Sequence, residues 1–260
     1  MTFTDQIGHT FELDGFPNRI ISVVPSQTEL LYDLGLEDRV LGITKFCIHP
    51  KEWLISKKRV GGTKNISLDK VAALNPDLII ANKEENTQAE IEALQKLYPV
   101  YTSDISNLAE SIKMITDIGI ITNTENEALR ITVKIQLEFK KLSKLKNELK
   151  RALYLIWKKP YMTINQNRFI NNMMIRCGFV NVIKKGVNYP ELSEKEIKDL
   201  NPEIILLSSE PFPFTEEHIT ELQSICPDAK VILVDGEYFS WYGSRLSEAP
   251  NYFMSLINEK

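Results

Sequence analysis

The residues that could take part in chemistry do not complete any catalytic motif. The three histidines, His9, His49 and His218, are far apart in the sequence. The HExxH, P-loop, GxGxxG and nucleophile-elbow patterns are all missing from the chain. The three cysteines are scattered and form no CxxC pair, so neither a metal site nor a disulfide framework is indicated. These features favour a binding protein over an enzyme.

The side chains most suited to holding a ligand follow predicted strands. Open α/β sheets bind ligands at the carboxyl ends of their strands, so the loops after those strands supply the candidate contacts. The candidates are Pro25, Ser26, Gln27, Phe46, His49, Asn82 and Lys83 in the first half of the chain, and Trp157, Tyr161, Asn165, Tyr189, Glu210, Phe212, Glu237, Tyr238, Phe239, Trp241 and Arg245 in the second. Aromatic rings dominate the second set, which suits a large, flat, partly apolar ligand. Each ring could equally be a packing residue.

The elements that must position these residues alternate between strand and helix. Buried-type strands are predicted at 19–24, 40–44, 78–82, 100–102, 153–157, 180–183, 204–208 and 230–234. A short helix opens at Ser26 and ends at Gly35, and another runs from Phe169 to Cys177 and ends at Gly178. This alternation predicts parallel sheets with right-handed crossovers. A small hairpin around Gly8 precedes them.

One helix–strand unit occurs twice. Residues 67–84, SLDKVAALNPDLIIANKE, return as residues 193–210, SEKEIKDLNPEIILLSSE, at an offset of 126 positions and with six identities. In each copy a serine can cap the helix, and the residue before proline avoids the helical region and so ends it. Two copies, each in about half of the chain, predict two lobes on one plan with a cleft between them.

A long helix is predicted between the lobes. Thr124 and Glu127 form a capping-box pattern, and apolar residues recur at helical spacing up to Lys150 without glycine or proline. The sequence therefore predicts a first lobe at 1–122, a linking helix at 123–151 and a second lobe at 152–260. The predicted fold class is two Rossmann-like α/β lobes joined by one long α-helix.

Composition restricts the partners. The 260 residues carry a net charge of −4 without acidic or basic blocks, so nucleic acid is not an expected partner. No stretch is long and apolar enough to span a bilayer, and we expect a monomer.

The N-terminus has no apolar signal region. The expected location is the periplasm or cell envelope if an export signal has been removed, and the cytoplasm if Met1 is the true start.

Four segments give the chain a family resemblance, namely VVPSQTELLYDLGL, ALNPDLIIA, YPELSEKEIKDLNPEIILL and DGEYFSWYGSRL. They are similar to the helical-backbone periplasmic binding proteins, the receptors of ABC importers for vitamin B12, haem and ferric siderophores, and most similar to the cobalamin-binding branch. The likeness extends over residues 19–257. It implies a class III substrate-binding fold and a corrinoid carried as transported ligand, with no cofactor and no catalysis.

The resemblance also assigns residues. It places Pro25, Ser26, Gln27 and Phe46 of the first lobe, and Trp157, Tyr189, Tyr238 and the acidic Glu237 of the second, against the ligand. Gly61 and Asn82 stand where the vitamin B12 receptor has tryptophans, so the first-lobe wall is less aromatic. The family docks on its permease through one acidic residue per lobe. Asp69 fits that position in the first lobe, whereas in the second Lys195 occupies it between Glu194 and Glu196.

Two alternatives stay open. Within the binding class, a haem receptor would need an iron ligand such as His49 or Tyr238, and a siderophore receptor would need several converging cations, of which Lys83 and Arg245 are the obvious ones. Outside that class, the missing signal sequence suits an intracellular accessory protein that handles corrinoids or metals. The sequence favours the corrinoid receptor.

Overall fold

The computed structural model describes residues 1–145, 148–184, 186 and 188–258. The chain divides into two compact units. The first unit comprises Met1–Ile105, Ala109–Ile135 and Tyr242–Ser247, and the second comprises Ser106–Leu108, Gln136–Trp241 and Glu248–Lys260. Residues 242–247, which we call the return segment, therefore join the first unit although the sequence assigned them to the second lobe.

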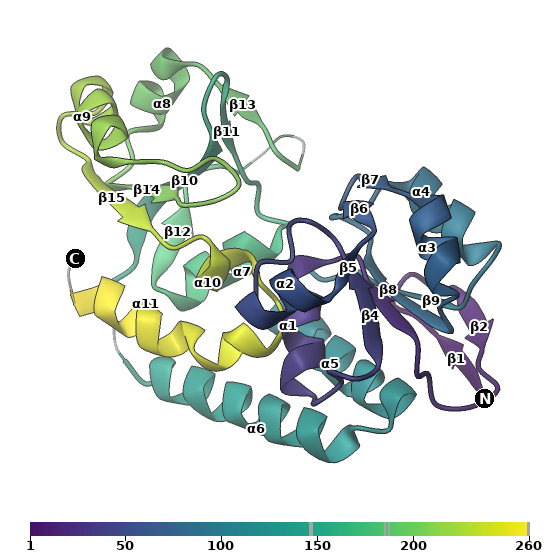
Figure 1. The fold of residues 1–260 in the computed structure, drawn as a ribbon. Helices are drawn as coiled ribbons and strands as arrows, with labels where there is room; N and C mark the ends of the chain where they lie inside the picture. Colours follow the sequence, from purple (N-terminus) through teal and green to yellow (C-terminus); the bar gives the residue numbers. More distant parts are fainter. Residues whose placement is uncertain (146–147, 185, 187, 259–260) are drawn as a thin grey trace. The chain divides into compact units, whose positions relative to one another are not determined.

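The first unit contains a five-stranded sheet in which every pairing is parallel, as predicted (Figure 1). Its order is β5 (Lys58–Arg59), β4 (Val40–Ile43), β3 (Ile20–Ser22), β8 (Leu78–Asn82) and β9 (Val100–Ser103). The connecting segments contain α1 (Pro25–Asp33), α2 (Lys51–Ser56), the small β6 (Gly61–Gly62) and β7 (Asn65–Ile66) pair, α3 (Leu68–Leu74) and α4 (Gln88–Gln95), and α5 (Leu108–Thr122) follows β9. Strands β3, β4, β8 and β9 therefore end at one edge of the sheet.

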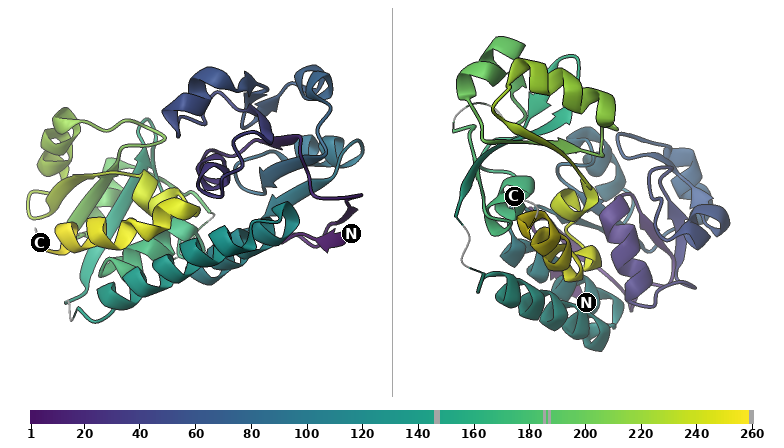
Figure 2. Two further views of the ribbon diagram at one scale, coloured as in Figure 1. Left: turned by 60° about the horizontal axis from the view of Figure 1, so that its bottom comes forward. Right: turned by 90° about the vertical axis from the view of Figure 1, so that its left-hand side faces the viewer.

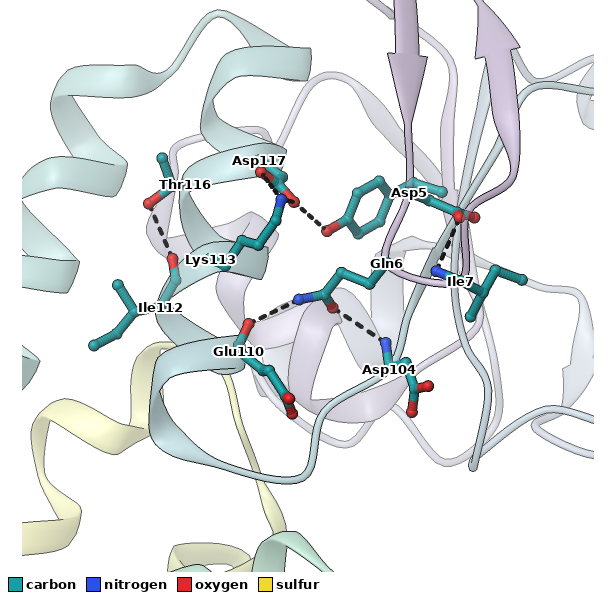
Figure 3. Close-up of polar contacts among 10 residues, drawn as sticks. Asp5, Gln6, Ile7, Asp104, Glu110, Ile112, Lys113, Thr116 and Asp117 are labelled. Carbon is teal, nitrogen blue, oxygen red and sulfur yellow. Dashed lines mark hydrogen bonds and ion pairs between the residues drawn. The ribbon is translucent and has the colours of Figure 1, made fainter.

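The N-terminal hairpin of β1 (Thr2–Thr4) and β2 (Thr10–Glu12) forms as predicted, and its turn covers edge strand β9. The backbone of Thr102 donates to Asp5 Oδ2 at 3.0 Å and accepts from the Gln6 N–H at 3.2 Å. The Gln6 carboxamide donates to the Glu110 carbonyl at 2.9 Å and accepts from the Asp104 N–H at 3.1 Å (Figure 3). These bonds occupy the polar groups of an edge strand that would otherwise pair with another chain.

The second unit contains a six-stranded mixed sheet. Its order is β13 (Glu191–Leu192), β11 (Tyr161–Thr163), β10 (Lys150–Trp157), β14 (Ile204–Ser208) and β15 (Lys230–Val234), with β12 (Phe179–Asn181) also pairing with β10. Strands β10, β14 and β15 are mutually parallel, as predicted, whereas β11 returns antiparallel to β10, which the sequence did not predict. The helices are α7 (Phe169–Arg176), α8 (Glu194–Leu200), α9 (Glu216–Ile225), α10 (Glu237–Ser240) and α11 (Ala249–Asn258).

The duplicated unit has the same local structure in both copies. Helices α3 and α8 end at Asn75 and Asn201, whose φ angles of +42° and +43° place both in the left-handed region. In each copy an arginine holds this helix end. Arg19 donates to the Asn75 carbonyl at 2.8 Å, and Arg151 donates to the Asn201 carbonyl at 2.9 Å. Carbonyl groups at a helix C-terminus lack intrahelical partners, so each arginine satisfies one of them.

The linking helix is shorter than predicted. Helix α6 spans Glu125–Leu142 rather than reaching Lys150 (Figures 1 and 2). Lys150 is already in strand β10, where residues 150–152 pair with β12 and the Lys150 N–H donates to the Gly178 carbonyl at 3.1 Å. Apolar spacing continues across 145–149, but pairing with a strand almost 30 residues away determines where β10 begins.

Candidate functional site

In the first unit, the loop after β3 is held by the residues predicted to touch ligand. Ser26 is buried, and its backbone carbonyl lies against Gly243 of the return segment. Gln27 is completely buried, and its carboxamide donates to the hydroxyl of Ser103 at the end of β9. Pro25 is half-buried at the first position of α1. Packing at Ser26 and the Gln27 side chain therefore fix the start of α1 at the edge of the sheet.

Asn82 bonds within the first unit, and its predicted role as a ligand contact stays a prediction. Its side chain is 1% exposed. Its amide group donates to Ser103 Oγ at 2.9 Å, and its amide oxygen accepts the backbone N–H groups of Glu84 and Glu85 at 2.8 and 3.0 Å. The sequence placed Asn82 correctly at the end of β8, but these bonds use its polar atoms to shape the following loop.

Phe46 provides the apolar surface of the first unit at the end of β4. Its ring is 51% exposed, and Lys45 Nζ lies 4.9 Å from the ring centroid. A Cβ atom on Gly62 would lie 3.3 Å from the Phe46 ring, so the ring rests directly on that backbone. His49 is half-buried in the same loop. The Phe46 ring is therefore accessible, and it stays a predicted ligand contact.

Arg245 is not placed as a ligand contact, because it forms a buried ion pair. It donates twice to Glu29 of α1, from Nε at 3.0 Å and from Nη2 at 2.6 Å. Burial raises the pKa of Glu29, and the charges of Arg245 and His49 oppose that rise. In the same return segment, a Cβ atom on Gly243 would lie 2.5 Å from the Ser26 carbonyl oxygen. The return segment is thus closely packed on α1.

In the second unit, Trp157 is the most exposed of the predicted aromatic contacts. It is the last residue of β10, and 39% of it is exposed. Its ring packs edge to face on Phe212, with a centroid distance of 5.7 Å and an interplanar angle of 70°. Phe212, another residue predicted at the strand ends, lies in the loop after the neighbouring strand β14.

Three other predicted contacts of the second unit are packing residues. Tyr161 is buried in the core, where its hydroxyl donates to Glu221 at 2.6 Å. Phe239 is completely buried, 5.3 Å from the Tyr154 ring. Trp241 is 6% exposed, and its indole N–H donates to Glu210 at 3.0 Å. Each side chain thus has its surface or its polar atom occupied within the unit, and its contact with a ligand stays a prediction.

Two tyrosines retain partly exposed surface. Tyr189 is half-buried, and the Arg168 guanidinium lies 5.8 Å from its ring centroid. Tyr238 is also half-buried and stacks on Tyr252 of α11 at 4.6 Å. Both stay predicted ligand contacts, and each ring has one neighbour that fixes its orientation.

A carboxylate predicted at the strand ends, that of Glu210, lies where β14 and β15 end. Glu210 accepts hydrogen bonds at Oε1 from the Ser240 hydroxyl at 2.5 Å and from the Trp241 indole. Burial raises the pKa of Glu210, and the nearby Glu237 and Asp235 raise it further. This end of the sheet is therefore acidic.

Replacement of Glu210 by glutamine is expected to raise the melting temperature at neutral pH. Glutamine keeps an acceptor oxygen for Ser240 and Trp241 but cannot ionise. Since the pKa of Glu210 is raised above its ordinary value of 4.5, the stability present below that value is lost as pH rises through the folded-state pKa.

Thermal melts of both proteins from about pH 4 to about pH 8 test this expectation. The advantage of Glu210→Gln should disappear at the acidic end. The matched control is Glu217→Gln, at an exposed position in the first turn of α9. Melting curves that differ equally at every pH would show that the carboxylate charge is not the cause.

The acidic residues proposed for permease docking lie in the first turns of the two repeated helices. Asp69 in α3 and Glu194 in α8 are exposed. Glu196 is also exposed, but its carboxylate accepts from the Ser193 backbone at 2.8 Å and from the Ser193 hydroxyl at 2.7 Å, which completes a capping box. These bonds lower the pKa of Glu196. The Glu196 carboxylate is thus engaged by the capping box, and the docking role of Asp69, Glu194 and Glu196 stays a prediction.

The described residues form neither a metal centre nor a membrane span. Within the part of the chain that the structure describes, no group of three or more histidine, cysteine, aspartate or glutamate residues is arranged to hold a metal ion. Among the same described residues, no helix is long and apolar enough to cross a bilayer.

Comparison with known proteins identifies related sequences and folds. A vitamin B12-binding protein of Vibrio cholerae is 27% identical over 209 residues, which cover 78% of this chain and 72% of that protein. The crystal structure of the periplasmic vitamin B12-binding protein BtuF of Vibrio cholerae has a TM-score of 0.79 at 22% identity, covering 94% of this chain and 98% of that chain. A periplasmic haem-binding protein from Pseudomonas aeruginosa has a TM-score of 0.81 at 17% identity, covering 94% of each chain.

These structural similarities confirm the predicted fold class, two α/β lobes with a long helix between them. The fold is common to both ligand classes, because a protein that binds vitamin B12 and a protein that binds haem share it. The sequence profile of the family described as periplasmic binding protein matches residues 20–225, which is most of the chain. The chain therefore belongs to the periplasmic binding protein family.

Proposed function

We propose that this protein is the non-catalytic substrate-binding component of an ABC importer, and that it binds cobalamin or a related corrinoid. Family membership supports the transport role, and the names of the Vibrio cholerae relatives support the corrinoid. The observation that most supports the proposal is the surface at the strand ends of the second unit. There the exposed Trp157 ring ends β10, and the carboxylates of Glu210 and Glu237 follow the adjacent parallel strands β14 and β15. This surface offers flat apolar area together with hydrogen-bond acceptors.

The charge of this surface favours a corrinoid over an anionic ligand. The edge of a corrin ring carries uncharged carboxamide groups, whose N–H groups can donate to carboxylates. Haem carries propionates, and many siderophores are anionic, so these ligands would face like charge at Glu210 and Glu237. Lys83, one of the cations expected to help a siderophore, pairs with Asp104, and Arg245 is engaged by Glu29. The two most obvious cations are thus already neutralised.

The proposal has two further parts. The protein delivers its ligand to a permease, and it acts outside the cytoplasmic membrane. Asp69 and Glu194, both exposed at the start of equivalent helices, would contact the permease. A further relative, 26% identical over 217 residues, is an uncharacterized ABC transporter substrate-binding lipoprotein of Bacillus subtilis. Its name supports a cell-envelope role for this chain.

A haem receptor is the second candidate function. The similarity to haem-binding proteins of the same fold favours it. His49 and Tyr238 remain its possible iron ligands, as predicted from the sequence. Tyr238 is stacked on Tyr252, so iron ligation would require its hydroxyl to be directed away from that contact.

Titration of the purified protein with cyanocobalamin, haem and a ferric siderophore tests the proposal. We expect one cyanocobalamin per chain, with saturable heat and a change in corrinoid absorbance, and at least tenfold weaker binding of haem and siderophore. A tenfold difference corresponds to about 1.4 kcal/mol, which a single like-charge contact can supply. Tight haem binding without any cyanocobalamin response would replace the proposal by the second candidate.

A further inference from the structure

The indole of Trp157 lies at the end of a chain of ring contacts. Trp157 is the last residue of β10, beyond the buried part of the strand. Phe212 meets it at 70°, and the Phe212 N–H donates to the Ile156 carbonyl at 3.3 Å, which ties the Phe212 loop to the residue before Trp157. A partly exposed ring at a strand end would otherwise rotate among its rotamers.

Phe212 is itself held by two further rings. Phe214 lies 4.8 Å away at 65°, and His218 of α9 lies 5.4 Å away at 85°. Phe214 is buried in the core of the second unit, whereas Phe212 is only partly buried against that core. Phe214 and His218 are themselves 5.3 Å apart, so the three rings form one cluster in which a core residue and a helix residue together set the orientation of Phe212.

His218 is fixed by the first turn of α9. Its Nδ1 accepts the Thr215 N–H at 2.9 Å and lies 3.0 Å from the Thr215 hydroxyl. A backbone N–H can only donate, so Nδ1 is the unprotonated nitrogen of this ring. The bond is part of the capping box of α9, which anchors the ring to a helix that packs on the same core. Because this bond fixes the His218 ring to α9, the ring also restricts the movement of Phe212.

We propose that Phe212 is a positioning residue for the ligand surface, and that His218 in turn positions Phe212. The proposal rests on the proposed function, because the ligand is taken to stack on Trp157. The edge contact with Phe212 keeps one face of the indole exposed in a single orientation before the ligand arrives. Ordering a free side chain on binding weakens affinity by about threefold to tenfold, so an indole fixed in advance binds more tightly.

The test compares Phe212→Leu with Phe212→Tyr. Leucine removes the ring but keeps apolar volume, whereas tyrosine keeps the ring edge and should restore wild-type behaviour. Phe16→Leu is the matched control, because Phe16 is a 44% exposed ring in the first unit. Affinity for cyanocobalamin is measured by calorimetry. Acrylamide quenching of the unliganded protein reports mainly on Trp157, since Trp53 and Trp241 are 0% and 6% exposed.

We expect Phe212→Leu to bind cyanocobalamin threefold to tenfold more weakly and to be quenched more strongly, while Phe212→Tyr and Phe16→Leu match the wild type. The His218→Asn variant, whose amide oxygen can still accept the Thr215 N–H, should show a smaller loss than His218→Leu. Wild-type affinity in Phe212→Leu would overturn the positioning role and leave the proposed function intact. A wild-type protein that binds no corrinoid would overturn both.

Discussion

Replacement of Arg245 by alanine is expected to lower the free energy of unfolding by about 3 to 5 kcal/mol. The side chains of Arg245 and Glu29 are 12% and 17% exposed, and two hydrogen bonds join them. Without the guanidinium, the Glu29 carboxylate stays buried with no equal compensation for its lost hydration. Because burial raises the pKa of Glu29, the loss should be smaller at acidic pH, where the carboxyl is protonated.

Urea unfolding of Arg245→Ala at neutral and acidic pH measures this loss. The double variant Glu29→Leu with Arg245→Met removes both charges and should recover most of the stability. The control is Lys83→Ala, which breaks an exposed ion pair with Asp104 and should cost less than about 1 kcal/mol. A cost for Arg245→Ala as small as that of the control would show that the return segment is not anchored by this pair.

Replacement of Trp157 by alanine is expected to weaken cyanocobalamin binding about thirtyfold, which corresponds to about 2 kcal/mol. The indole supplies the largest exposed aromatic surface at the strand ends of the second unit, and removal of such an anchor from a desolvated contact usually has an effect of this size. Stability should fall by only about 1 kcal/mol, because the main loss within the protein is the edge contact with Phe212.

Calorimetry and thermal unfolding of Trp157→Ala separate these two effects. Trp157→Phe, which keeps a smaller flat ring, should retain most of the affinity. Phe16→Ala serves as the control for the loss of an exposed ring elsewhere. Unchanged affinity in Trp157→Ala, with tight binding in the wild type, would place the ligand on surfaces other than this strand end.

The repeated unit was the most reliable guide to the fold. The serine at the start and the Asn-Pro pair at the end are local signals, and the structure places both helix ends at the equivalent asparagines. The end of α6 could not be read in the same way. Its last residues keep helical spacing, and the competing strand pairing with β12 is a contact between distant parts of the chain.

The ends of the parallel strands could be predicted from the sequence, but the partners of the side chains there could not. Asn82 and Arg245 show why. Both are polar residues in or after strand ends, and their types suit a ligand as well as they suit the protein's own hydroxyl groups or carboxylates. Which partner each side chain takes depends on contacts with Ser103 and Glu29, which are 21 and 216 residues away in the sequence and so leave no local pattern.

The return segment has a consequence for the order in which the chain can fold during synthesis. The first unit includes residues 242–247, so it cannot be completed until residue 247 has emerged from the ribosome. Domains usually fold as units beginning from the N-terminus. Here Glu29 of α1 meets its partner Arg245 only after 216 further residues have been synthesised. A fragment that stops after α6 would lack Arg245, and it would also lack Gly243, which packs against the Ser26 carbonyl of α1.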